Sequence, residues 1–156
     1  MTEHGPQGGD EINILSEEEM EKKINFGWPI ATYGELGPTP IKENKFTAKN
    51  KNNHTPNGFK EPLFWFKGNS VAPSAIVNVD GFKEEFKSDF FMSAMGNVPA
   101  PGRRALHHFR FDQKKTELIQ EDIIPIGERI RDLIYLKEKK MIVMILENSP
   151  SLAILK

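Results

Sequence analysis

Short runs of β-branched and aromatic residues recur along the chain, and clusters of Gly, Pro, Asn and Asp separate them. Such runs are typical of β-strands, because branched and aromatic side chains pack well on a pleated surface. The expected fold class is therefore all-β. The pattern predicts strands at residues 10–15, 74–79, 89–95, 104–111, 115–123, 129–136, 140–146 and 151–155.

One short helix and one long loop interrupt this pattern. Ser16 and Glu19 have the spacing of a capping box, and apolar residues four positions apart follow, which predicts a helix over residues 17–24. Residues 34–61 are polar and rich in Pro, Gly and Asn. Such a composition predicts a long excursion between strands.

The strands after Pro73 follow one another at short turns, a rhythm typical of β-sandwiches, barrels and propellers. A meander would place the four strands up to Ile124 in one sheet and the three strands from Arg129 in a second sheet that lacks a member. A closed propeller often completes its last blade with a strand from the other terminus, so this fits a chain whose beginning lies elsewhere. The Gly-rich opening segment adds to that expectation. A plain β-sandwich explains the same rhythm.

The composition narrows the function classes. The 156 residues carry 21 basic and 22 acidic side chains in scattered positions, so the basic surface of a nucleic-acid-binding protein is not expected. The longest apolar run, Met141 to Leu146, is too short to span a bilayer, and the N-terminus lacks the layout of a signal peptide. The absence of cysteine excludes disulfides and thiolate metal sites, and it leaves the compartment open.

A glycine-rich segment near the N-terminus has the chemistry of a calcium site. Between His4 and Glu11, turn carbonyls adjoin the carboxylates of Asp10 and Glu11, and calcium prefers such oxygen donors. An ordinary turn with solvated acidic residues explains the same residues, because the alternating carboxylates of common calcium loops are missing.

Two arginines on a predicted strand could bind a molecule with several carboxylates. Strand alternation points Arg129 and Arg131 to one face, and Ile130 and Asp132 to the other. A guanidinium binds a carboxylate through two donors and keeps its charge at every relevant pH. The alternative is an exposed strand face on which Asp132 pairs with a neighbouring base.

Trp65 and Phe66 precede small hydroxyl residues such as Ser70, so they could stack on a flat cofactor, although such aromatics also serve as core. His107 and His108 point to opposite faces of a predicted strand, cannot share one metal, and are expected to be structural. The sequence offers no Ser/His/Asp or Cys/His set, phosphate-binding glycine loop or zinc-spaced cluster. Hydrolase and nucleotide-binding functions therefore have no support.

Four segments resemble, in order, the motifs of one enzyme family. They are His4-Gly-Pro-Gln-Gly-Gly-Asp-Glu-Ile-Asn13, Asn25-Phe-Gly-Trp-Pro29 with Tyr33-Gly34, Val71-Ala-Pro-Ser74, and Arg129-Ile-Arg-Asp132. Together they resemble the glucose/sorbosone dehydrogenase family over nearly the whole chain. The resemblance implies that residues 1–156 form the C-terminal two to three blades of a six-bladed β-propeller, in a periplasmic or secreted protein.

The same resemblance implies a reaction. An aldose would be oxidised at its first carbon by hydride transfer to pyrroloquinoline quinone (PQQ), while calcium acts as a Lewis acid. The carbonyl groups of Gly5 and Pro6 would bind this calcium, and Asp10 and Glu11 would lie at a second, structural calcium. The residues implied to hold PQQ are Arg129 and Arg131, at its carboxylates, and Ser70.

Two departures from the family pattern bear on activity. Gly96 follows the strand after which the family has a PQQ-contacting lysine, and Arg103 or Arg104 are candidates to replace that lysine. The family's catalytic histidine base and a further PQQ-binding arginine belong to earlier blades, which we do not expect in this chain. No catalytic residue is therefore assigned, and His4 keeps its place in the calcium motif.

Three hypotheses follow. The chain is part of a PQQ-dependent sugar dehydrogenase, completed by N-terminal blades that hold the base. Alternatively, it is a non-catalytic β-rich binding module that kept the fold and lost the chemistry. A third possibility is that two or three copies assemble into a closed ring. If the chain is part of a longer protein, exposed sheet edges should make it prone to association by itself.

Overall fold

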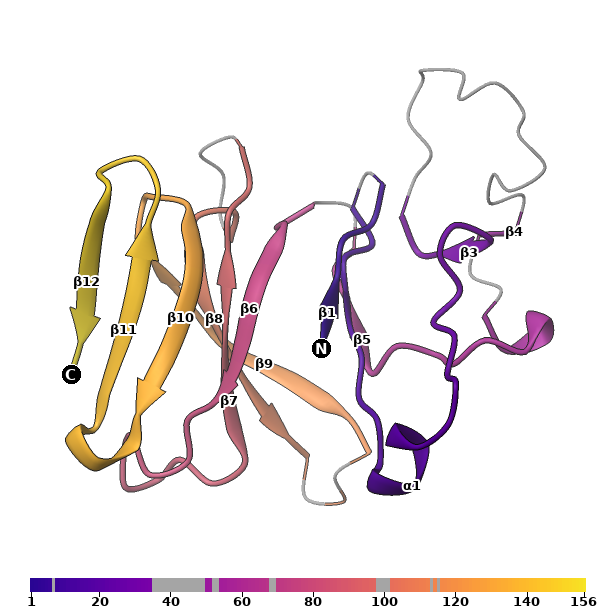
Figure 1. Cartoon of the computed structure of the whole chain (residues 1–156), viewed down its shortest axis with the longest axis horizontal. Coiled ribbons are helices and arrows are strands. Elements are labelled where there is room, and N and C mark those ends of the chain that lie inside the picture. Colours follow the sequence, from indigo (N-terminus) through magenta and orange to yellow (C-terminus); the bar gives the residue numbers. More distant parts are fainter. Residues whose placement is uncertain are drawn as a thin grey trace. The chain divides into compact units, whose positions relative to one another are not determined.

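The computed structural model of this chain describes residues 1–6, 8–34, 50–51, 54–67, 70–97, 102–112, 114 and 116–156. Much of the predicted excursion at residues 34–61 lies outside the described residues. The chain divides into two units, Met1–Ser70 and Val71–Lys156, and each is described by itself (Figure 1).

The first unit contains short elements. Strands β1 (Thr2–Glu3), β2 (Glu11–Ile12) and β5 (Phe64–Trp65) form an antiparallel sheet in that order, and β3 (Ala31–Thr32) pairs in parallel with β4 (Asn50–Lys51). A helix α1 (Glu17–Met20) and a 3-10 helix η1 (Thr55–Asn57) lie between strands. The strand predicted at residues 10–15 is therefore reduced to its first part.

Helix α1 is shorter than predicted, although its capping box forms. The Ser16 hydroxyl accepts a hydrogen bond from the Glu19 amide, and the Glu19 carboxylate accepts one from the Ser16 amide. The helix has no buried residue, so no packed apolar face extends it beyond its first turn. The prediction of a helix over residues 17–24 was thus right about where it begins and wrong about where it ends.

The second unit contains the two sheets that the sequence predicted. Its seven strands are β6 (Pro73–Asn78), β7 (Asp89–Ala94), β8 (Ala105–Phe111), β9 (Leu118–Pro125), β10 (Ile130–Leu136), β11 (Met141–Leu146) and β12 (Ser151–Leu155). Strands β6 to β9 form a four-stranded antiparallel meander, and β10 to β12 form a three-stranded one, with a 3-10 helix η2 (Lys137–Lys139) at the first turn (Figure 1). The all-β prediction is confirmed, and the arrangement is consistent with part of a propeller.

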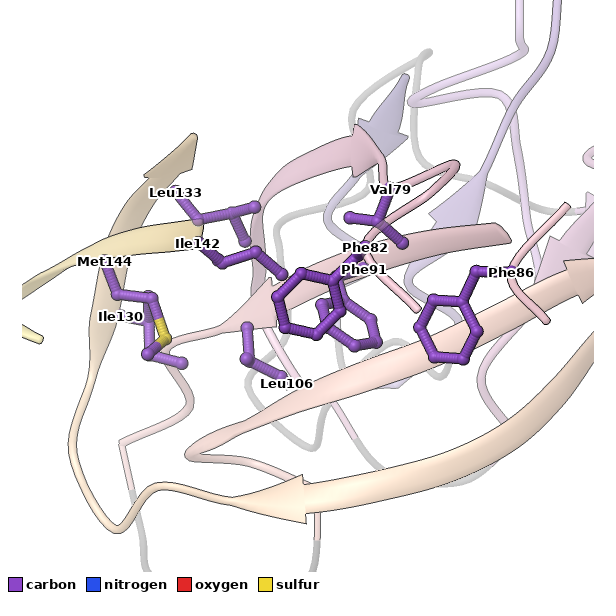
Figure 2. Close-up of a cluster of buried hydrophobic side chains, with 9 residues drawn as sticks. All are labelled: Val79, Phe82, Phe86, Phe91, Leu106, Ile130, Leu133, Ile142 and Met144. Carbon is purple, nitrogen blue, oxygen red and sulfur yellow. The ribbon is translucent and has the colours of Figure 1, made fainter. Parts of the chain in front are cut away.

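The core of this unit lies where the two sheets meet. Figure 2 shows aromatic side chains from β7 and the β6–β7 connection beside aliphatic ones from β8, β10 and β11. Phe82 and Phe91 meet edge to face with their ring centroids 6.0 Å apart. The buried cluster consists of Val79, Phe82, Phe86, Phe91, Leu106, Ile130, Leu133, Ile142 and Met144.

A bulge in β10 corrects one prediction. Strand alternation predicted that Ile130 and Asp132 share a face, but the register of β10 shifts between these two residues. Ile130 and Leu133 are buried instead, and Asp132 is exposed, where its carboxylate accepts the Leu133 amide at 2.8 Å. Burial of an unpaired carboxylate is costly, and the extra residue of the bulge avoids it.

The three-stranded sheet is also apolar on its solvent-exposed side. Ile134, Ile145, Leu152 and Ile154 are between 48% and 68% exposed. Ile145 pairs with Leu152 across the sheet, and Val143 pairs with both Ile134 and Ile154, so these side chains form cross-strand rows. A sheet that is apolar on both faces is typical of a sheet with a packed neighbour on each side.

Candidate functional site

The glycine-rich segment of the first unit folds into a turn in which backbones approach closely. A Cβ atom on Gly9 would lie 2.0 Å from the amide nitrogen of Gly34, and one on Gly5 would lie 2.0 Å from the Gly8 carbonyl oxygen. Gly9 also has a φ of +67°. Only glycine tolerates both constraints, so the turn is built around backbone atoms.

Asp10 closes this turn from inside the protein. Its carboxylate is fully buried and accepts the Gly5 amide at 2.8 Å and the Ser70 hydroxyl at 2.9 Å. The structure therefore brings together three of the predicted site residues. Ser70, predicted as a cofactor contact, holds the carboxylate that was predicted as a metal ligand.

Glu11, the next residue, is also buried and faces a histidine. Its Oε1 lies 3.4 Å from Nε2 of His54, a side chain with no exposed surface, and its Oε2 lies 3.4 Å from the Asn13 amide nitrogen. Burial raises the pKa of Glu11 to about 7, although the Asn13 hydrogen bond opposes this. Burial lowers the pKa of His54.

A second carboxylate lies on the other side of the same imidazole. Oε2 of Glu61 is 3.9 Å from Nδ1 of His54 and accepts the Tyr33 hydroxyl at 2.7 Å. Burial opposes ionisation of Glu61, but hydrogen bonds from Thr55 and Tyr33 hold its pKa below the usual value. Burial and the neighbouring Glu61 raise the pKa of Tyr33 to about 12.

The aromatic rings of this unit form a stack. Tyr33 lies between His54 and Trp65, with centroid distances of 5.1 and 4.5 Å and nearly parallel planes. The Lys67 ammonium lies 5.5 Å from the centre of the Trp65 ring. Trp65 is half-buried and is thus already stacked on protein, while its role against a cofactor stays a prediction.

A small hollow open to solvent adjoins the turn and Glu11. It is lined by Glu3, His4, Gly9, Glu11, Phe26, Trp28, Ala31 and Thr32. In the part of the chain that the structure describes, no three His, Asp or Glu side chains lie close enough together to hold a metal ion. The ligands predicted at Gly5 and Pro6 are backbone carbonyl groups rather than side chains, and they stay a prediction.

In the second unit, Arg129 and Arg131 converge on one carboxylate. Nη1 of Arg129 lies 2.8 Å from Oε1 of Glu147, and Nε of Arg131 pairs with the other carboxylate oxygen. The Arg129 Nε donates to the Met95 carbonyl at 2.8 Å, which fixes the direction of that guanidinium. The two arginines are thus neighbours, and Glu147, rather than Asp132, is their partner.

Packing explains the glycine at position 96. Its amide donates to the Arg103 carbonyl at 2.7 Å, and a Cβ atom on Gly96 would lie 2.8 Å from the Arg103 Cβ. A lysine therefore does not fit there without movement of the backbone. Arg104 donates to the Asn97 carbonyl at 2.9 Å, and replacement of the family lysine by Arg103 or Arg104 stays a prediction.

The adjacent histidines are structural, as expected. His107 contacts the Gly102 carbonyl at 2.6 Å and the Gln120 side chain at 2.8 Å, whereas His108 pairs with Asp89 at 2.6 Å. These separate partner sets show that the two rings do not share a site.

Three residues of the site, His54, Glu61 and Glu147, were not predicted from the sequence. The first two lie within the predicted excursion at residues 34–61, where no periodicity indicated a buried side chain. Glu147 could have been found from the hairpin, because β10 and β11 pair Ile130 with Leu146 and thereby set Arg129 beside Glu147.

Comparison with known proteins places these residues in a family. The sequence model of the glucose/sorbosone dehydrogenase family matches residues 1–154. The chain belongs to that family. The resemblance seen in the four motifs is thereby confirmed.

Two curated proteins are similar in sequence to this chain. The aldose sugar dehydrogenase YliI of Escherichia coli is 33% identical over 96 residues, which are 61% of this chain and 23% of that protein. An uncharacterized protein of Synechocystis sp. is 27% identical over 133 residues, which are 85% of this chain and 27% of that protein. The chain thus spans about a quarter of the length of either relative.

No solved structure matches the chain. Among the helices of the described residues, none has the length and apolar character that a membrane-spanning helix requires.

Proposed function

We propose that this chain supplies a calcium-binding turn and a cofactor-binding arginine pair to a PQQ- and calcium-dependent dehydrogenase that oxidises the C1 hydroxyl of an aldose. Membership of the glucose/sorbosone dehydrogenase family and similarity to an aldose sugar dehydrogenase support the sugar substrate. The single observation that carries the proposal is the convergence of Arg129 and Arg131 on one carboxylate.

The arginine pair fits a ligand with carboxylate groups. Glu147 stands in for such a group, since its two oxygens each face one guanidinium. PQQ carries carboxylates, and bidentate guanidinium pairs are among the stronger charged hydrogen bonds. Arg129 is anchored by the Met95 carbonyl, whereas the Arg131 side chain is 47% exposed and contacts Glu147 and the Met95 sulfur.

The turn fits a calcium ion bound by carbonyl oxygens. Among the described residues, no backbone amide donates to the carbonyl oxygens of Gly5 or Pro6. The Gly5 amide is tied to Asp10, so the peptide unit has a fixed orientation. Calcium takes six to eight oxygen ligands, so the remaining ones would come from water, cofactor or other residues.

When bound, PQQ accepts a hydride and calcium polarises the accepting carbonyl. The residues of this chain would orient the cofactor: Arg129 and Arg131 at its carboxylates, and Ser70 and Trp65 beside it. Asp10 would hold the turn in place. No general base is assigned to the chain.

Completion by further propeller blades belongs to the same proposal. The chain spans about a quarter of its relatives' length, and the exposed rows of Ile134, Ile145, Leu152 and Ile154 offer an apolar face for a neighbouring sheet. Residues 1–156 would then be part of one propeller domain. By analogy with the family, that protein would act in the periplasm or outside the cell.

A second candidate function is a non-catalytic binding module. Glu147 already neutralises charge on both arginines, and Gly96 occupies the position of a cofactor-contacting lysine. Either feature would fit a chain that kept the fold without the chemistry.

A titration of the chain with PQQ, at saturating calcium and again with a chelator, separates these candidates. The dehydrogenase proposal predicts saturable PQQ binding that calcium strengthens. Absence of saturable binding in both arms would contradict it and favour the binding module. Sugar oxidation is not the readout, because the proposed base lies outside this chain.

A further inference from the structure

His54 lies at the centre of the first unit and has no role in the proposed reaction. Its side chain has no exposed surface, and its two ring nitrogens face carboxylates on either side, Glu11 at 3.4 Å and Glu61 at 3.9 Å. Among the described residues, neither nitrogen makes a hydrogen bond. The imidazole thus occupies the space between the two carboxylates without a hydrogen bond to either.

The surroundings of Glu11 explain why a partner is needed there. A buried carboxylate without a positive or hydrogen-bonding partner is strongly disfavoured. Glu3 lies close by, since the Asn13 amide nitrogen reaches both Glu3 at 2.7 Å and Glu11 at 3.4 Å. Three acidic side chains, Glu3, Glu11 and Glu61, therefore lie around this part of the unit, and Asn13 and Tyr33 are among their hydrogen-bond donors.

The arrangement does not fit a second calcium ion at Asp10 and Glu11. The Asp10 carboxylate accepts hydrogen bonds from Gly5 and Ser70, and Glu11 faces His54. A metal ion bound between Glu11 and Glu61 would meet the imidazole, a ligand that hard cations such as calcium do not favour.

We propose that the His54 ring occupies the place that a structural metal ion would take between Glu11 and Glu61, and thereby positions the Gly5–Pro6 turn. Two routes connect His54 to that turn. Glu11 adjoins Asp10, whose carboxylate holds the Gly5 amide. Tyr33 stacks on His54, and its neighbour Gly34 packs against Gly9.

Close packing on the remaining side supports this role. A Cβ atom on Gly27 would lie 3.1 Å from Cδ2 of His54, and Gly27 has a φ of +106°. The His54 carbonyl accepts amides of the following turn, from Asn57 and Phe59, both at 3.0 Å. The ring is therefore held in place between its two acidic partners by packing and by its own backbone.

A double-mutant cycle tests whether His54 acts through Glu11. H54F keeps a ring against Tyr33 but removes the imidazole beside the buried Glu11 carboxylate, so the urea midpoint of unfolding should fall. In an E11Q background, the same substitution should lower the midpoint by less than half as much, because the uncompensated carboxylate is gone. Equal shifts in both backgrounds would show that His54 only fills space, and would overturn the proposal. If H54F does not fold, H54Q with E11Q makes the same comparison.

A calcium titration, followed by thermal unfolding and by calorimetry, tests whether a metal ion binds at Glu11. The proposal places no calcium at Glu11, so E11Q should bind as many calcium ions as the wild type, with an affinity lowered only as far as the Gly5–Pro6 turn loosens. A second bound calcium ion in the wild type that is missing in E11Q, counted by isothermal titration calorimetry, would place a metal at Glu11 and overturn the proposal. Failure of calcium to bind Gly5 and Pro6 would instead remove that binding from both proteins equally, so the two proposals fail separately.

Discussion

The Ser70 hydroxyl donates a hydrogen bond to the buried carboxylate of Asp10 at 2.9 Å, although sixty positions separate the two residues. Asp10 in turn accepts the Gly5 amide, so this contact ties the end of the first unit to its N-terminal turn. A residue expected to touch the cofactor thus also supports the proposed calcium ligands.

Replacing Ser70 should loosen that turn. S70A removes a hydrogen bond to a charged group, and we expect a loss of about 1.5–3 kcal/mol in the free energy of unfolding. Urea unfolding followed by Trp fluorescence measures it. S149A removes an exposed hydroxyl contact with Ser151 and should change stability by less than about 0.5 kcal/mol. Equal effects of the two substitutions would show that the Asp10 contact adds nothing.

Two glycine variants separate the effect of close backbone packing at the turn on stability from the effect of a left-handed backbone conformation. Gly9 and Gly58 both have positive φ values, +67° and +76°, but an added Cβ meets Gly34 at 2.0 Å in one case and nothing within 4 Å in the other. G58A should cost about 1 kcal/mol, the penalty of a left-handed alanine. G9A should cost several times more, because backbone atoms must move. Circular dichroism melts of both variants give the comparison, and similar melting temperatures would contradict the close packing.

His107 should make stability depend on pH. Nε2–H donates to the Gly102 carbonyl and Nδ1 accepts from the Gln120 amide, so the neutral ring is satisfied and a second proton would require the Gln120 amide to turn. Burial accordingly lowers the pKa of His107. Above a pH of about 6.5, both folded and unfolded forms are neutral and this contribution is fully present. As the pH falls through that value toward the lower folded pKa, the unfolded chain takes up a proton that the folded chain refuses, so stability is lost.

Unfolding free energies measured from pH 8 down to pH 5 test this sign. H107Q should give a shallower loss than wild type, because its side chain does not titrate. His54, whose pKa is also lowered, contributes in the same direction in both proteins and cancels in the difference. Parallel curves for wild type and H107Q would rule out a contribution from His107.

The sequence predicted the second unit better than the first. From β6 to β12, runs of β-branched and aromatic residues specify the strands of two meanders, and the observed ends differ from the predicted ones by at most three residues. In the first unit, strands of two residues are held by contacts distant in sequence, such as Glu11 paired with Trp65. Local periodicity does not encode such contacts.

The candidate site shows the same division. Arg129 and Arg131 were predicted to be neighbours, and they are, although a bulge interrupts the strand alternation on which that prediction rested. Their partner Glu147 could have been found from the hairpin pairing of Ile130 with Leu146. The place of His54 in the site could not be predicted from the sequence, because its neighbours Glu11, Tyr33 and Glu61 meet only after the chain has folded. The bulge after Ile130 likewise reflects the cost of burying Asp132, which a regular strand pattern ignores.

Glu147 should compete with a bound ligand for the arginine pair. E147Q removes the charge that holds both guanidiniums, so PQQ affinity at saturating calcium should rise, by up to about fivefold if one ion pair of up to ~1 kcal/mol is released. Quenching of intrinsic fluorescence by PQQ measures the dissociation constant. Weaker binding by E147Q would show that Glu147 orients the arginines rather than competing for them.

The central claim is that Arg129 and Arg131 hold the cofactor, and the PQQ dissociation constant of R131Q at saturating calcium tests it most directly. R110Q is the matched control, because Arg110 is also a half-exposed, ion-paired arginine of the second unit, with Asp89 and Glu121 as partners. The account predicts that R131Q weakens PQQ binding at least tenfold, about 1.4 kcal/mol, while R110Q leaves it unchanged. Equal dissociation constants for wild type, R131Q and R110Q would contradict it.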